Sequence, residues 1–188
     1  ADGSSGAAIA NWYAAFSSNQ TQAVVGSNVP TAITLNTTEL VNGIALDFLQ
    51  QIRFIHDGVY EISYSLEVRN TGGTPADVDI WFMKNGVDVV RKDRIKTIYG
   101  NSLKQLPSAD FILVMEAGDY LELFFASSSS SVELFATTSQ TTPFVRPAAP
   151  SAILNVHQIG VSVGSTSGSS GTSGTTGTSG TSGTKGTS

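Results

Sequence analysis

Alternation of apolar and polar side chains over residues 59–69 (VYEISYSLEVR) is the feature that most constrains this fold. Successive residues of a strand point to opposite faces, so the pattern predicts a strand with one buried face. The apolar positions are Tyr60, Ile62, Tyr64, Leu66 and Val68. Strand signals of this kind dominate residues 9–163, and no helical periodicity persists over about 11 residues. We therefore expect an all-β body.

Turn signals divide that body into short strands. Residues 77–84 alternate and end in Asn85-Gly86, which favours a tight hairpin. Residues 109–116 and 120–127 flank Ala117-Gly118-Asp119, and we expect them to form a second hairpin.

The remaining expected strands lie at residues 13–23, 32–35, 49–55, 131–138 and 152–163. Prolines forbid a ladder between the last two, so that stretch is expected to be an extended crossing loop. Short strands with turn signals every ~8–12 residues predict a jelly-roll β-sandwich.

Composition narrows the function classes. The chain of 188 residues has no cysteine, which excludes disulfides and thiolate chemistry, and its net charge of −5 argues against nucleic-acid binding through the whole surface. It has no apolar run long enough to cross a membrane as a helix, so we expect no membrane insertion. We expect one head domain at residues 9–163, a Gly/Ser-rich lead-in at 1–8 and a Gly-Thr-Ser tail at 164–188.

Glycine recurs at every third position of the tail. This spacing is what a collagen triple helix requires, since only glycine fits at its axis. The glycines are Gly168, Gly171, Gly174, Gly177, Gly180, Gly183 and Gly186. None of the six prolines lies there, and a flexible linker or a cloning remnant are the alternatives.

The order of several motifs resembles the globular head of complement subcomponent q and the tumour necrosis factor superfamily. The motifs are HDGVY at 56–60, WFMKNG at 81–86, LVMEAGDYLEL at 113–123 and a last apolar strand at 152–159. The resemblance covers roughly residues 50–160 and implies a jelly-roll fold and a homotrimer.

Three longer runs are similar to collagen-linked virion structural proteins of tailed bacteriophages, notably those of marine cyanobacteria. They are VDIWFMKNGVDV, AGDYLELFFAS and RPAAPSAILNVHQIG. This resemblance implies a non-enzymatic trimeric fibre or capsid-decoration protein on the virion surface, in contact with other virion proteins. The alternative is a receptor-binding or adhesin module that contacts host surface glycans through loops at 70–76, 91–105 or 140–151.

Few residues offer catalytic or metal chemistry. The chain lacks a nucleophile elbow, a phosphate loop and a zinc-protease motif, so we expect no enzyme, no cofactor and no metal. His56 is expected to belong to a turn, and His157 to be buried or at an interface. A calcium site at Asp77, Asp79 and Asp88 is the weaker alternative to a polar sheet edge.

Two residue sets are candidates for binding. Four cations could contact anionic sugar or phosphate groups: Arg91, Lys92, Arg94 and Lys96. Strands with apolar residues on both faces need cover from outside the protomer, unless both faces are intradomain core. The aromatic residues expected at a trimer interface are Tyr60, Tyr64, Tyr120 and Phe124.

Overall fold

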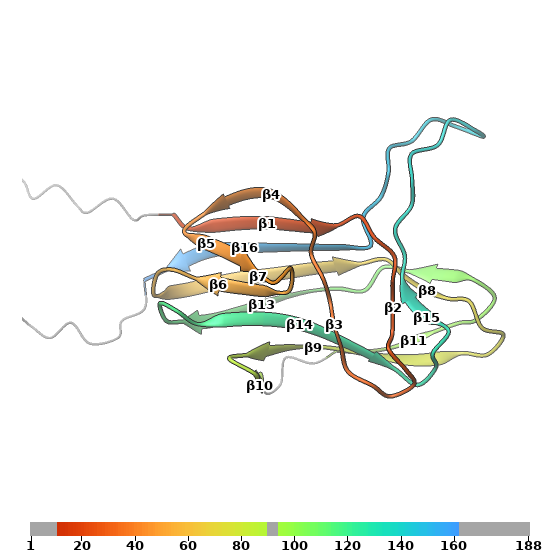
Figure 1. The fold of residues 1–188 in the computed structure, drawn as a ribbon, viewed down its shortest axis with the longest axis horizontal. Helices are drawn as coiled ribbons and strands as arrows, with labels where there is room; N and C mark the ends of the chain where they lie inside the picture. Colours follow the sequence, from red (N-terminus) through yellow and green to blue (C-terminus); the bar gives the residue numbers. More distant parts are fainter. Residues whose placement is uncertain (1–10, 90–93, 162–188) are drawn as a thin grey trace, which may run out of the picture.

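The computed structural model describes residues 11–89 and 94–161, and within these it contains strands and no helix (Figure 1). The strands are β1 (Tyr13–Ser18), β2 (Gln22–Ala23), β3 (Thr31–Ala32), β4 (Thr37–Asn42), β5 (Ile44–Asp47), β6 (Gln51–Phe54), β7 (Gly58–Leu66), β8 (Val68–Asn70), β9 (Ala76–Lys84), β10 (Val87–Asp88), β11 (Arg94–Ile98), β12 (Leu103–Gln105), β13 (Ser108–Met115), β14 (Tyr120–Ser127), β15 (Val132–Leu134) and β16 (Ala152–Gly160). The expected all-β architecture is confirmed. The lead-in at 1–8 and the tail glycines lie outside the described residues.

Two main sheets pack into a sandwich. The five-stranded sheet has the order β13-β7-β16-β1-β4, and the seven-stranded sheet has the order β10-β9-β14-β6-β5, with β11 added to β9 and β3 added to β14. A smaller sheet, β12-β8-β15-β2, lies at one end. All pairings between these strands are antiparallel, so no crossover helix is needed.

The inward faces of the two sheets form one aromatic and aliphatic core. Alternation in β7 is as predicted, because its buried side chains face the opposite sheet. The largest of the fully buried side chains are Tyr60, Phe16, Phe54, Phe82 and Phe125. The Phe54 and Tyr60 rings meet edge to face at 4.7 Å, a geometry that aromatic pairs prefer.

The Asn85-Gly86 hairpin is confirmed. Both residues have positive φ, 52° and 77°, as the two central positions of a type I′ turn require. Lys84 then pairs with Val87 across the turn.

The second expected hairpin is wrong. β13 pairs with β7 in the five-stranded sheet, whereas β14 pairs with β9 in the seven-stranded sheet. Ala117-Gly118-Asp119 therefore carries the chain from one sheet to the other. The amide of Gly118 donates to the carbonyl of Phe54 at 2.8 Å, and the amide of Ala117 donates to the Asp57 carboxylate at 2.6 Å. These two hydrogen bonds hold the crossing turn in place.

The proline-rich stretch crosses from β15 in the smaller sheet to β16 in the five-stranded sheet, as expected of a crossing loop, but it is not extended. Residues 135–150 fold back on themselves as a finger that projects from the body, opposite the end where residues 11 and 161 lie (Figure 1). Thr137 bridges to Ala149 and Gln140 bridges to Arg146. The guanidinium of Arg146 also donates to the Thr137 hydroxyl at 2.8 Å, tying the two limbs together.

Candidate functional site

The outward face of the five-stranded sheet, called here the open face, carries several exposed aliphatic side chains. β16 alternates between buried and exposed positions along its length, so every second side chain points away from the core. The exposed aliphatic side chains on the open face are Leu40 (56%), Ile112 (57%), Val114 (57%), Ile153 (38%) and Ile159 (51%). Between them lie polar residues such as Glu61, Asn155 and His157, so the open face mixes apolar and polar groups.

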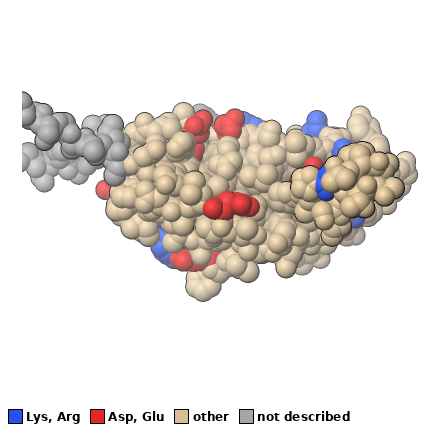
Figure 2. All heavy atoms as spheres, turned by 90° about the horizontal axis from the view of Figure 1, so that it is seen from above, with Lys and Arg blue, Asp and Glu red and all other residues tan. Residues whose placement is uncertain are grey.

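A groove of about 460 Å³ runs across part of the open face. Tyr13, Ala15 and Leu40 supply an apolar wall from β1 and β4, and Glu61 and His157 supply polar groups from β7 and β16. Glu61 and His157 stand directly opposite each other in the sheet register. Figure 2 looks onto the β4 edge of this sheet, where separate acidic groups stand among uncharged residues.

The four aromatic residues predicted for a trimer interface do not share a surface. Tyr60 has no exposed area, and its hydroxyl donates to the His56 carbonyl at 2.9 Å inside the protomer. Burial first, and then the nearby Asp57 charge, raise the pKa of Tyr60 to about 12. Tyr64 is 3% exposed and also lies between the sheets. Neither side chain offers an outer surface to a partner.

Tyr120 and Phe124 lie instead on the outer face of the seven-stranded sheet. Phe124 stacks on Trp81 with ring centroids 5.9 Å apart, and the guanidinium of Arg53 lies 6.0 Å from the Tyr120 ring centre. Both rings are half-buried by residues of their own chain. Phe124 is therefore covered within its own domain, as the alternative prediction had it, and not by a neighbouring subunit.

The predicted cation cluster is only partly described. Arg91 and Lys92 lie outside the described residues. Arg94 and Lys96 lie on β11, which is a strand rather than a loop. Because they are two residues apart, their side chains lie on the same side of that strand. The Arg94 guanidinium lies over the Phe111 ring, 5.0 Å from its centre. Both cations line one pocket.

The two histidines occupy unlike settings. His56 stacks on Trp12 at 3.8 Å with the ring planes 10° apart, a packing contact that fits the expected turn role. His157 is exposed on the open face, so it is not buried, and its interface alternative is the one that the geometry permits.

The calcium alternative gains no support. Asp77 accepts a hydrogen bond from the Thr97 hydroxyl at 2.7 Å, and Asp88 accepts one from the Trp81 indole at 3.0 Å. Over residues 11–89 and 94–161, no three side chains of the metal-ligating kind gather. The same part of the chain forms no helix long and apolar enough to span a membrane.

Comparisons with known proteins bear on the fold alone. No protein-family profile matches the chain, and no curated protein sequence matches it. Its structure is similar to the crystal structure of murine APRIL at pH 8.5, with a TM-score of 0.51 and 10% sequence identity. The match covers 80% of this chain and all of that one. This likeness supports the expected jelly-roll fold.

Sequence reasoning missed the open face itself. Ile153, Asn155, His157 and Ile159 alternate with buried residues in β16, and that mixed outward row could have signalled a contact surface. Ile112 and Val114 gave no such signal, because the apolar run FILVM does not say which side faces the core.

Proposed function

We propose that this chain is a non-enzymatic structural head that assembles as a homotrimer and is displayed on a phage particle. The observation that carries the trimer is the open face, whose aliphatic side chains are exposed in the protomer. The structural likeness to murine APRIL supports the proposal. It agrees with the sequence resemblance to the tumour necrosis factor superfamily, which implies a homotrimer.

Burial energetics favour self-association through this face. Each Å² of apolar surface removed from water contributes about 25 cal/mol, and stable interfaces bury roughly 800 Å² per partner. The groove with Glu61 and His157 adds polar groups that set register, since charged partners must be matched when they are buried. The seven-stranded sheet has less need of a partner, because Trp81 and Phe124 already cover each other.

The test compares two identical substitutions on opposite sheets. Val114→Asp puts a carboxylate on the open face, where Val114 is 57% exposed, and Val87→Asp does the same on β10, where Val87 is 69% exposed. We expect the full chain to elute with a mass of about 59 kDa, three times its 19.6 kDa, in light scattering. Val114→Asp should shift it towards monomer and Val87→Asp should not. A monomeric parent chain would refute the trimer, and dissociation by Val87→Asp but not by Val114→Asp would refute assembly through the open face.

Placement on a virion rests on the resemblance to phage structural proteins and on the Gly-x-y tail, which lies outside the described residues. The measurement is mass spectrometry and antibody labelling of purified particles from a host culture. Detection at stoichiometric levels on intact particles supports the placement, and absence from them contradicts it. Circular dichroism of the full chain should show a triple-helix signal that melts with the trimer, if the tail is collagen-like.

The finger favours a second candidate function, recognition of a host surface. At its tip Phe144 is 63% exposed and Val145 is 81% exposed, and the finger points away from the end where residues 11 and 161 lie (Figure 1). Exposed loops on a rigid scaffold are where sandwiches display recognition. Replacing Phe144 and Val145 together by serine should abolish host-cell and glycan-array binding without changing the oligomeric mass. Unchanged binding would rule the finger out.

A further inference from the structure

A second pocket lies at the edge of the sandwich, between β11 and the segment that leads from β12 into β13. Its volume is about 490 Å³, within the range of small-molecule sites. Arg94 and Lys96 line it from β11, and Tyr64 lines it from the core side. Its apolar lining is Ile95, Leu106 and Pro107.

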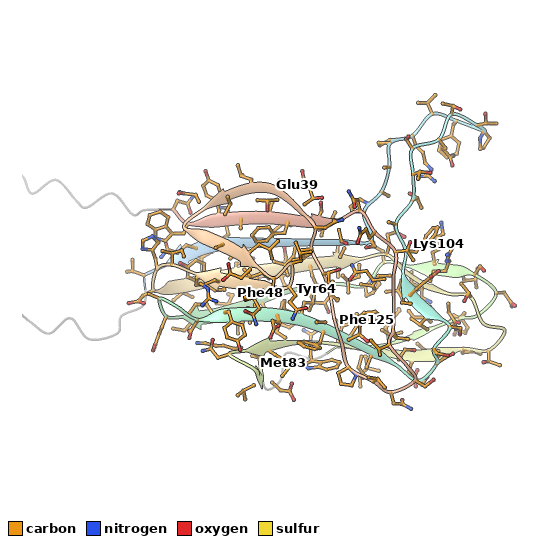
Figure 3. All side chains as sticks on the ribbon, viewed as in Figure 1. Glu39, Phe48, Tyr64, Met83, Lys104 and Phe125 are labelled. Atoms are coloured by element: carbon orange, nitrogen blue, oxygen red, sulfur yellow. The ribbon has the colours of Figure 1, made fainter. Side chains whose placement is uncertain are left out.

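Tyr64 supplies a buried donor without an acceptor. The side chain, labelled in Figure 3, is 3% exposed. Its ring packs near Phe82 at 5.9 Å and Phe111 at 6.2 Å, and its hydroxyl has no hydrogen-bond partner among the described residues. Buried polar groups are normally paired, and an unpaired one is costly. Burial raises the pKa of Tyr64 to about 12, although the Arg94 charge opposes the rise, so the hydroxyl keeps its proton near neutral pH. It can therefore donate to an acceptor that enters the pocket.

Arg94 and Lys96 make the pocket positively charged. The Arg94 guanidinium is held over the Phe111 ring, which belongs to the same aromatic cluster as Tyr64. A guanidinium presents its donors as a planar fork that matches a carboxylate, and Lys96 adds a second positive charge. An anion is the ligand that these donors would hold.

We infer that this pocket binds a small organic carboxylate, with the carboxylate held by Arg94 and the Tyr64 hydroxyl and its apolar body against Leu106 and Pro107. The apolar wall distinguishes this ligand from inorganic phosphate, which would leave that wall in contact with water. The inference goes beyond the trimer proposal and does not depend on it, because Tyr64 lies on the inward side of β7 and not on the open face.

The experiment is titration calorimetry of the full chain with hexanoate, with hexan-1-ol as the uncharged analogue and inorganic phosphate as the anion without an apolar body. Three variants are measured alongside: Tyr64→Phe, Arg94→Gln and the control Lys104→Gln. Tyr64→Phe keeps the ring that packs on Phe82 and removes only the hydroxyl. Lys104→Gln removes one positive charge from a side chain that lies over Phe135, 4.5 Å from its ring centre.

We expect hexanoate to bind one per chain and more tightly than either analogue. Loss of a hydrogen bond to a charged group should weaken hexanoate about tenfold or more in Tyr64→Phe and in Arg94→Gln. Lys104→Gln should stay within about twofold, because the Lys104 side chain lies over Phe135 and does not line the pocket. Equal binding of hexan-1-ol, tighter binding of phosphate, or unchanged affinity in Tyr64→Phe would each overturn the inference.

Discussion

Asp119 joins the two sheets where the chain crosses between them, and its removal should be costly. One carboxylate oxygen accepts from the Glu116 amide at 2.8 Å and lies 2.6 Å from the Lys84 ammonium, and the other accepts from the Asn85 amide at 2.6 Å. The Asp119 side chain is only 12% exposed. It therefore holds the crossing turn against the Asn85-Gly86 hairpin.

The substitution Asp119→Asn keeps the shape and removes the charge. In the variant, an amide NH₂ group replaces one of the two oxygens that accept hydrogen bonds from the Glu116 amide, Lys84 and Asn85. Hydrogen bonds to a charged group contribute about 1.5–3 kcal/mol, and the partly exposed Lys84 adds less. We expect the free energy of unfolding at pH 7 to fall by about 2–3 kcal/mol.

The loss should depend on pH. Burial alone would raise the pKa of Asp119, but the bonds from Lys84, the Glu116 amide and Asn85 outweigh it and hold the pKa below its ordinary value of 3.8. A carboxyl with a depressed pKa stabilises the folded state above its unfolded pKa, and this contribution is lost as the pH falls through the folded pKa. The difference between parent and Asp119→Asn should thus shrink below pH 3.8.

Urea unfolding at equal protein concentration, from pH 7 down to about pH 2, measures this difference. Asp110→Asn is the control, because Asp110 is exposed on β13, and its effect should stay within about 0.5 kcal/mol. A difference for Asp119→Asn below about 0.5 kcal/mol at pH 7, or one that does not change with pH, would refute the reasoning.

Three further substitutions test packing by the same unfolding measurement. Gly100→Ala would place its Cβ 2.5 Å from the Gly72 carbonyl oxygen and 2.8 Å from the Gly73 carbonyl carbon, and since backbone cannot yield cheaply we expect a loss of about 2 kcal/mol or more; a neutral result would contradict this close approach. Tyr64→Phe removes the unpaired hydroxyl, so without ligand it should gain about 1 kcal/mol, and a loss would mean that the hydroxyl is paired. Phe125→Ala empties a fully buried site and should cost about 3–5 kcal/mol; a cost below about 1 kcal/mol would contradict its core position.

Local pattern was sufficient for elements whose signal is complete within a few residues. The alternation of residues 59–69 predicted β7, and Asn85-Gly86 predicted its hairpin, because side-chain parity and positive φ are local properties. β4 was missed, since TTELVN on a sheet edge has little apolar alternation. β11 lies within residues 91–105, which we expected to be a loop, and only its pairing with β9 makes it a strand of the seven-stranded sheet.

Sheet membership needed information that the local pattern does not carry. β13 and β14 are joined by a short turn, which favours a hairpin, yet each pairs with a distant strand. The prediction of interface residues failed for the same reason. Tyr60 and Tyr64 were correctly placed on one face of a strand, but whether that face meets the opposite sheet or a partner depends on tertiary packing.

β13 and β14 both carry apolar residues on two faces, and they differ in whether the second face is covered within the protomer. In β14 the second face is covered within the protomer, because Phe124 stacks on Trp81 and Glu122 is buried, accepting from the Gln50 amide at 3.1 Å. In β13 the second face carries Ile112 and Val114, each 57% exposed. The demand for external cover therefore moves from the seven-stranded sheet to the five-stranded one. For this reason Val114, and not Phe124, is the position at which a single charge should separate the subunits.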